Sequence, residues 1–238
     1  MSTVAVAGEG GVVASANEIV GTRHAEVTIK QIAMLTADCR SDLTHIAVGV
    51  GPGPYTSTRV GVATGLALGK ALKIPVVGIC TLDAIAAGVI HADRTPSEDF
   101  GVASDARRRE IYWAKYRAES EQVVRVGEPL VGPPTEVIAA HPNTSWAGDG
   151  LTRYPELVAE CEVRVIDPAF PDAVDVARLA IDALLGGEVT SATSPELNSH
   201  GGDGAGAVPA GAVLLAPVPL YLRRPDAQPL TKHRVAMP

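Results

Sequence analysis

The segment of the sequence best suited to phosphate binding is GVGPGPYTSTRVGVA, at residues 49–63. Glycine-rich turns between a strand and a helix can hold a phosphate with their backbone N–H groups. A dinucleotide-binding loop needs G-x-G-x-x-G, but Pro54 stands where a motif begun at Gly49 and Gly51 needs its third glycine. A Walker A loop needs G-x-x-x-x-G-K-[ST], and the nearest match, GLALGKA at 65–71, is one residue short and ends in alanine. Both standard nucleotide-binding patterns therefore fail.

Three interpretations of this segment stay open. In the first, prolines stiffen a structural turn made of Gly51, Pro52, Gly53 and Thr56, with glycines taking φ values that other residues avoid. In the second, the N–H groups of residues 55–57 bind an anion at the start of a helix. In the third, the turn contacts a partner.

Three glycines, Gly61, Gly65 and Gly69, recur every four residues in the helix expected after this turn. Each costs about 1 kcal/mol relative to alanine inside a helix, so a compensating gain is required. A face without side chains lets another backbone come close. We therefore expect it to pack against a helix, either the one at 24–38 or one from another subunit, and packing within the chain is the alternative.

Searches for a nucleophile or a metal site find no established pattern. There is no G-x-S-x-G elbow, and no H-x-x-x-H or H-E-x-x-H pair that would place two metal ligands on one helical face. Asp105, Asp149 and Asp175 could act as general bases or magnesium ligands, but aspartates beside Gly, Ser or Ala more often cap helices and turns. We expect capping at all three.

Arg107, Arg108 and Arg109 form the only basic run in the sequence. Arginines at the start of a strand usually belong to a solvated sheet edge, where they discourage pairing with other chains. A local contact with RNA is the alternative.

The elements that must position these residues alternate between strands and helices. Strand-like TVAVA and VVASANEI, at 3–7 and 12–19, flank GEGG and predict an antiparallel hairpin. Apolar periodicity and runs then predict further elements, which are a helix over 24–38, a strand over 44–50, a helix over 57–73, a strand over 74–79 and a helix to residue 91 capped by Thr81. Such alternation indicates an α/β fold with a mixed sheet, and we place the first domain at 1–95.

The second half, 96–238, is less regular. FGVASDARRREIYWAKYR predicts two strands joined by a polar turn. Three helices are expected at 134–141, 150–160 and 172–185, with SWAGDG and CEVRVI as short strands between them. Residues 186–213 are rich in Gly, Ala and Ser without periodicity and predict a flexible segment. The closing segment is expected to be held by Tyr221 and Leu222.

Composition excludes several classes of protein. A net charge of −7 over 238 residues argues against a surface devoted to nucleic acid, so any contact with RNA must be local or supplied by a partner. Three widely spaced cysteines favour a reducing cytoplasm. The start of the chain lacks the pattern of a signal peptide, and no apolar run is long enough to cross a membrane. We expect a cytoplasmic protein.

Together these motifs resemble the TsaB (YeaZ) family. The string GPGPYTSTRVGVATGLALGKALKIPVVGICTLDAIA follows the family pattern G-P-G-S-F-T-G-x-R-x-G, a small-residue helix, I-P-x-x-G and a further S/T-L-x-A helix. Other matches are His24 and Glu26 in H-x-E, SDARRREIYWAKY, AGDG and PLYLR, so the resemblance covers about 15–226. Pro54, Tyr55 and Ser57 depart from the usual Ser, Phe and Gly.

The resemblance implies an actin-like ATPase fold, shared with sugar kinases and Hsp70, of two RNase H-like lobes. It implies a non-catalytic subunit that binds and stabilises its catalytic paralogue TsaD, and the ATPase TsaE joins the two. The complex transfers threonylcarbamoyl to the tRNA adenosine beside the anticodon. Contact with tRNA is then expected only through the complex. The isolated protein is expected to form a homodimer and to bind no cofactor, nucleotide or metal. TsaD-type proteins carry a metal-binding H-x-x-x-H, whereas here Thr28 stands four residues after His24, where the second histidine would be.

In the family, the first two helices form the surface for TsaD and for the homodimer. By that resemblance the expected partner-binding residues are His24, Val27, Gln31, Met34, Leu35, Arg59, Gly61, Val62, Gly65, Leu66 and Gly69.

One departure concerns the first sheet. The family begins with a central strand ending in Asp-Thr-Ser, which is missing before TVAVA. Without it we expect two exposed edges in the first sheet and doubtful nucleotide binding, because related ATPases hold phosphate at that turn. Two enzyme alternatives remain, an ATP-dependent phosphotransferase of the same superfamily and a glycoprotease-like peptidase.

Overall fold

The computed structural model describes residues 2–19, 23–92, 99–119, 122–186 and 214–222. The predicted flexible segment 186–213 lies almost wholly outside the described residues, as does the domain boundary at 95–96. None of the helices in the described part of the chain is long and apolar enough to cross a membrane.

The N-terminal half follows the predicted order of elements. Its strands are β1 (Ser2–Gly8), β2 (Gly11–Glu18), β3 (Ile46–Gly51) and β4 (Val76–Cys80). Its α-helices are α1 (His24–Leu35), α2 (Tyr55–Leu72) and α3 (Thr81–His91), with a short 3₁₀ turn at Arg40–Asp42. The predicted hairpin is confirmed, since β1 and β2 pair antiparallel, and β3 and β4 pair in parallel across the α2 crossover.

The C-terminal half is built around a five-stranded sheet in the order β7-β6-β5-β8-β9. Its strands are β5 (Phe100–Asp105), β6 (Ile111–Glu119), β7 (Gln122–Gly132), β8 (Trp146–Ala147) and β9 (Val165–Ile166). Its helices are α4 (Pro134–Ala140), α5 (Pro155–Glu160) and α6 (Ala173–Leu185). The sequence missed β7, which is the longest strand.

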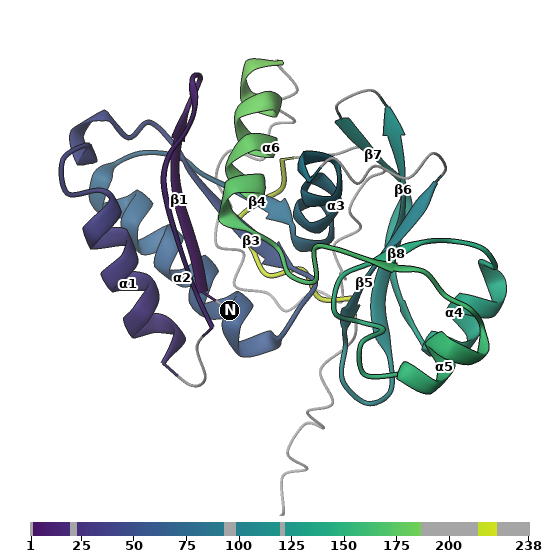
Figure 1. The fold of residues 1–238 in the computed structure, drawn as a ribbon. Helices are drawn as coiled ribbons and strands as arrows, with labels where there is room; N and C mark the ends of the chain where they lie inside the picture. Colours follow the sequence, from purple (N-terminus) through teal and green to yellow (C-terminus); the bar gives the residue numbers. More distant parts are fainter. Residues whose placement is uncertain (1, 20–22, 93–98, 120–121, 187–213, 223–238) are drawn as a thin grey trace, which may run out of the picture.

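The single mixed sheet predicted for the first half is not formed by the described residues. There, β1–β2 and β3–β4 are separate two-stranded sheets, and no hydrogen-bonded strand joins them. In Figure 1 the β1–β2 ribbon stands between α1 and α6, apart from β3 and β4. Among the described residues, β1 pairs only with β2 and β3 pairs only with β4, so each strand has one edge without a strand partner.

Helix α3 lies at the centre of the molecule. Eight of its residues are buried, from Leu82 to Val89. Four of them pack with Phe100, Val102 and Ala147 in one hydrophobic cluster, and these are Leu82, Ile85, Ala86 and Val89. A helix that is apolar on all sides must be covered on all sides. The elements around it come from both halves, so α3 is shared by the two cores (Figure 1).

One polar group is buried with α3. The Asp83 carboxylate accepts hydrogen bonds from Arg125 on β7 and from the Tyr116 hydroxyl on β6. Burial raises the pKa of Asp83, and the Arg125 guanidinium acts in the opposite direction. Cys80 lies in the same cluster, where burial raises the pKa of its thiol. Cys80 is therefore held as a neutral thiol.

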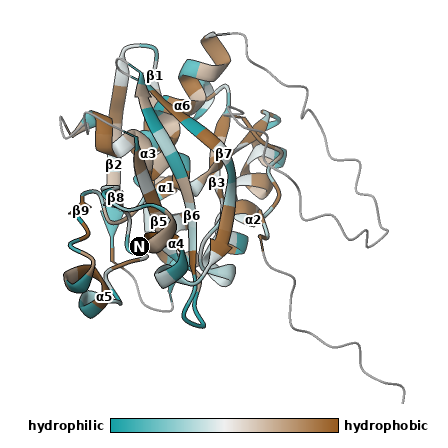
Figure 2. Cartoon of the chain, turned by 90° about the vertical axis from the view of Figure 1, so that its right-hand side faces the viewer, coloured by the Kyte–Doolittle hydropathy of each residue, from teal (hydrophilic) through white to brown (hydrophobic). Residues whose placement is uncertain are grey.

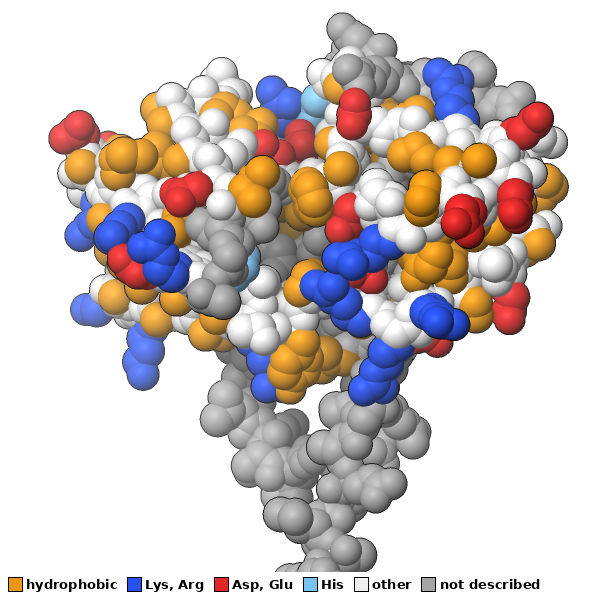
Figure 3. Space-filling model, turned by 60° about the horizontal axis from the view of Figure 1, so that its bottom comes forward, with side chains coloured by type: hydrophobic (Ala, Val, Ile, Leu, Met, Phe, Trp, Pro, Cys, Tyr) orange, Lys and Arg blue, Asp and Glu red, His pale blue; other side chains and the backbone are white. Residues whose placement is uncertain are grey.

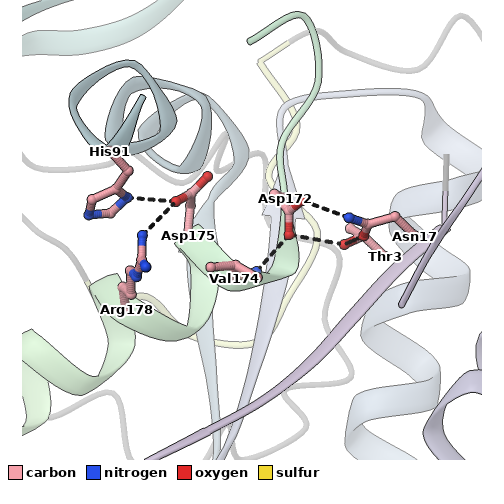
Figure 4. Close-up of polar contacts among 7 residues, drawn as sticks. All are labelled: Thr3, Asn17, His91, Asp172, Val174, Asp175 and Arg178. Carbon is pink, nitrogen blue, oxygen red and sulfur yellow. Dashed lines mark hydrogen bonds and ion pairs between the residues drawn. The ribbon is translucent and has the colours of Figure 1, made fainter. Parts of the chain in front are cut away.

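Helix α6 begins at a cap that also reaches the first hairpin. Asp172 accepts a hydrogen bond from the Val174 N–H at 2.8 Å and another from the Asn17 side chain at 2.8 Å (Figure 4). The hydroxyl of Thr3 accepts from the Ala173 N–H. The start of α6 is therefore attached to β1 and β2, although the sequence separates them by more than 150 residues.

Asp175, one turn further along α6, bonds to α3. Its carboxylate lies 2.7 Å from Nδ1 of His91 and 3.9 Å from Arg178 (Figure 4). Burial raises the pKa of Asp175 and His91 opposes that rise. The prediction that Asp175 caps a helix is wrong, because Asp172 is the cap and Asp175 instead holds α3 and α6 together.

Candidate partner-binding surface

Helices α1 and α2 contact each other and lie side by side on the part of the molecule farthest from the five-stranded sheet (Figure 1). Large apolar side chains point outward from both, namely Ile29 and Met34, which are 57% and 64% exposed, and Leu66 at 39%. We call the outward faces of these two helices the α1–α2 surface. Exposed apolar residues gathered on neighbouring elements are typical of protein–protein contacts.

The predicted partner-binding residues divide into an exposed group and a buried group. Met34, Arg59 and Leu66 are exposed, while His24, Leu35 and Gly61 are partly exposed. The others are buried, and they are Val27, Gln31, Val62, Gly65 and Gly69. The buried group supports the helices from beneath, while the exposed group can be reached by a partner.

Gln31 shows how α1 is fixed to the hairpin. The hydroxyl of Ser2, on β1, donates to Oε1 of Gln31 at 2.9 Å and lies 2.7 Å from the hydroxyl of Thr28. Thr28 also donates to the His24 carbonyl one turn earlier. The residue that stands four places after His24 thus has a structural role between α1 and β1.

The glycine stripe of α2 packs against strands, so the prediction that it packs against a helix is wrong for two of its three members. A Cβ atom at Gly65 would lie 2.3 Å from Cγ1 of Val48 on β3, and one at Gly69 would lie 2.3 Å from Cγ2 of Val76 on β4. A Cβ at Gly61 would have nothing within 4 Å. Helix α2 is therefore seated closely on the β3–β4 pair, which is the alternative of packing within the chain.

The turn before α2 is held from behind by two other segments. Gly51 has a φ of 98°, its peptide bond to Pro52 is cis, and its N–H donates to the hydroxyl of Thr81 at 3.0 Å. Leu220 donates its N–H to the carbonyl of Val50 at 2.7 Å. The prediction that Thr81 caps α3 is wrong, because Cys80 is the N-cap residue and Thr81 accepts its bond from the turn instead. On the outer side of the turn, Gly53 is partly exposed and Thr56 is exposed.

An aromatic and arginine cluster extends the α1–α2 surface at the start of α2. The guanidinium of Arg59 lies 3.8 Å from the centre of the Tyr55 ring and donates to the hydroxyl of Tyr221. The two tyrosine rings are 5.4 Å apart. Tyr221 was expected to hold the closing segment, and this cluster is how it does so. No pattern in the sequence indicated that Tyr55 belongs to this cluster.

The acidic residues considered for catalysis are placed in two groups. Asp105 and Asp149 lie together, since the N–H of Asp105 donates to Oδ1 of Asp149 at 3.2 Å, whereas Asp175 lies apart with His91. Burial, followed by the charge of Asp105, raises the pKa of Asp149. Asp105 stabilises its turn by accepting from the N–H of Arg107, as predicted for a turn cap. Among the described residues no group of three or more His, Cys, Asp or Glu could hold a metal ion.

Comparison with known proteins identifies the family of this chain. Residues 3–171 match the family model of TsaD, described as tRNA N6-adenosine threonylcarbamoyltransferase. Shorter relatives named tRNA threonylcarbamoyladenosine biosynthesis protein TsaB include that of Escherichia coli, which is 27% identical over 63% of this chain and 68% of its own length. The chain belongs to the TsaB (YeaZ) family. The Bacillus subtilis TsaB is 35% identical over 42% of the chain and 45% of its own length.

Solved structures support the same membership. YeaZ from Pseudomonas aeruginosa superposes with a TM-score of 0.68 at 28% identity, covering 78% of this chain and 88% of that one. A second structure, of an uncharacterised protein described as similar to the peptidase YeaZ, gives a TM-score of 0.70 at 27% identity over 93% and 94%. The TsaB-family fold of the chain is thus shared along nearly its whole length.

Longer relatives occur in mycobacteria. An uncharacterised Mycobacterium leprae protein is 36% identical over 87% of this TsaB-family chain, which spans 46% of the relative's length. An uncharacterised Mycobacterium tuberculosis protein is 35% identical, and the chain spans 78% of it. The chain therefore covers about half of the first relative and most of the second.

Proposed function

We propose that this TsaB-family chain is a non-catalytic subunit in the biosynthesis of threonylcarbamoyladenosine on tRNA, acting in the cytoplasm by binding a TsaD-type protein through the α1–α2 surface. The names of the TsaB relatives support the process. The observation that carries the proposed mode of action is the outward display of Ile29, Met34 and Leu66 from two adjacent helices.

The chemistry of the surface suits a partner protein. Its centre is apolar, and Tyr55 and Arg59 at one end are of the residue types that dominate binding energy in protein interfaces. The charged pair Lys30–Glu26, which is exposed on α1, satisfies itself at 2.8 Å and adds no net charge. On this face, covering the Lys30–Glu26 pair buries no unpaired charge, whereas Arg59 keeps its hydrogen bond to Tyr221 and is free to pair with an acidic group of the partner.

The support beneath the surface makes it rigid before it binds. The buried contacts of Gly65 and Gly69 fix α2 on its strands, and the Ser2–Gln31 bond fixes α1 on the hairpin. A partner therefore meets side chains on helices already in place, which lowers the entropy lost on association. Stabilisation of the TsaD-type protein would follow from mass action, because a ligand of the folded state favours that state.

Co-purification tests the proposal. A tagged chain is expressed with the TsaD-type protein of the same genome, and Met34→Glu is compared with Leu130→Glu, a similar change at an exposed β7 residue in the other half. We expect Met34→Glu to weaken binding by roughly tenfold or more, since a buried interface charge costs on the order of 2 kcal/mol, while Leu130→Glu binds normally. Equal binding by both variants, with both folded by circular dichroism, would contradict the proposed surface.

The role in tRNA modification needs its own measurement. Cells depleted of this protein should lose threonylcarbamoyladenosine from tRNA hydrolysates, and the wild-type chain should restore it. Normal levels of the modified nucleoside after complete depletion would refute the proposed function.

A further inference from the structure

The turn between β5 and β6 presents three arginines in an uncommon backbone conformation. Arg107, Arg108 and Arg109 have φ values of 61°, 55° and 63°, in the left-handed region that favours glycine. All three side chains are exposed. Three successive non-glycine residues in this region are costly, and such outliers are concentrated at functional sites.

The interpretation of these arginines as protection of a sheet edge is wrong. In the sheet order β7-β6-β5-β8-β9, the strands β5 and β6 that the turn joins are both interior. Beyond Val102, where β5 no longer pairs with β8, Gly150 and Asp149 bond to the β5 backbone instead, so arginines are not needed to guard that edge. Another explanation for the basic run is therefore required.

A buried carboxylate holds the turn in shape. Asp105, only 9% exposed, accepts from the N–H of Arg107 at 2.8 Å and forms ion pairs with the Arg107 and Arg153 guanidinium groups at 3.3 and 2.8 Å. The Glu110 N–H closes the turn on the Arg107 carbonyl at 3.1 Å. Both guanidinium groups stay largely in solvent, with side chains 66% and 57% exposed. The acidic groups thus lie beneath and the arginines lie outermost.

We call Arg107, Arg108, Arg109 and Arg153 the arginine turn. In Figure 2 the loop at the foot of β6 is hydrophilic, and Figure 3, with the bottom of the molecule forward, shows Lys and Arg side chains gathered on this face. Guanidinium groups bind phosphate oxygens through paired N–H donors, and a preformed fork loses little entropy on binding. Since the chain as a whole carries −7, this is a local site on an acidic protein.

We propose that the arginine turn contacts the phosphate backbone of tRNA within the assembly. This inference rests on the proposed function, because it takes the RNA to be the substrate of the complex that the chain joins. The contact is independent of base sequence, as contacts from guanidinium groups to phosphates are. It positions the RNA and takes no part in the chemistry.

The test uses the full chain bound to its TsaD-type partner. Fluorescence anisotropy measures the affinity for unmodified tRNA across a series of salt concentrations. Arg108→Gln and Arg109→Gln are combined, leaving Arg107 and Arg153 on Asp105. The matched control combines Arg117→Gln with Arg164→Gln, two exposed arginines outside the α1–α2 surface. Both double variants lose the same formal charge.

We expect the arginine variant to bind tRNA about tenfold more weakly. The slope of log affinity against log salt concentration should be smaller by about one to two, because binding with fewer phosphate contacts releases fewer counterions. A third variant, Arg108→Lys with Arg109→Lys, should keep most of the affinity since it keeps the charge. Recovery there also excludes misfolding of the turn as the cause.

Three results would overturn the proposal. One is an unchanged affinity and slope in the arginine variant. Another is an equal loss in the Arg117 and Arg164 control, which would make the effect one of bulk charge. The last is loss of co-purification with the TsaD-type protein, which would make the turn a protein contact. If the partner still co-purifies while tRNA binding is unchanged, this inference fails and the proposed function stands.

Discussion

Alanine substitutions at Gly61 and Gly65 add the same methyl group to the same helix one turn apart, and their effects on folding should be opposite. At Gly65 the new Cβ would lie 2.3 Å from Cγ1 of Val48 and 3.7 Å from Cγ2 of Ile46. Val48 is only 9% exposed, so it has no open space to move into. At Gly61 the new Cβ would meet nothing within 4 Å.

The magnitude follows from two terms. Alanine is favoured over glycine inside a helix by about 1 kcal/mol, a gain common to both variants. Overpacking of a buried contact costs about 1 to 3 kcal/mol and applies to Gly65→Ala alone. We therefore expect Gly61→Ala to raise the free energy of unfolding by about 0.5 to 1 kcal/mol, and Gly65→Ala to lower it by up to about 2 kcal/mol.

Urea unfolding followed by far-ultraviolet circular dichroism measures both changes. The difference between the two variants is the informative quantity, because the helix term cancels and leaves the overlap with Val48, expected at about 1 to 3 kcal/mol. Unchanged m-values would show that the unfolded states remain comparable. Equal midpoints for the two variants would refute the conclusion that α2 is seated on β3 through Gly65.

Two further predictions concern buried charge. Replacing Arg125 by Met leaves the Asp83 carboxylate buried beside Tyr116 without its cation, so the free energy of unfolding should fall by about 3 to 5 kcal/mol in urea titrations, and a fall below about 1 kcal/mol would contradict the ion pair. Asp149 has a raised pKa in the folded protein, so the folded state holds its proton more tightly, and the resulting stability is lost as pH rises above the ordinary pKa of 3.8. Asp149→Asn should therefore flatten that part of the profile of urea midpoint against pH. An unaltered profile would exclude the shift.

The elements that the sequence predicted are those with a strong local pattern. The β1–β2 hairpin, the β3–α2–β4 crossover and α3 follow from turn residues, apolar runs and helical spacing, each of which acts over a few residues. Strand β7 was not predicted because its buried and exposed residues do not alternate as in a typical strand. Its two buried residues are Arg125, which bonds to Asp83, and Pro129, and neither is typical of the buried face of a strand.

The candidate surface shows the same limit. Spacing of glycines indicated that α2 comes close to another backbone, but it could not indicate whether that backbone is a helix or a strand, since both require only missing side chains. Side-chain partners far apart in sequence were equally hidden, as with Thr81 and Gly51 or Tyr55 and Tyr221. The resemblance to the family supplied the proposed partner-binding residues, and the structure separated the exposed ones from the buried ones.

The turn that opens α2 explains why this surface can serve a partner. Gly51 is held by Thr81, and Val50 is held by Leu220, from two segments that lie far along the chain. Arg59 and Tyr221 join the same closing segment to the outer side of α2. Because the turn is bonded from behind and the helix is seated on β3 and β4, binding has little left to order. Under the proposed function, the glycine-rich stretch is the fixed base of a protein-binding helix, and the Gly65→Ala and Met34→Glu variants test this arrangement from its two sides.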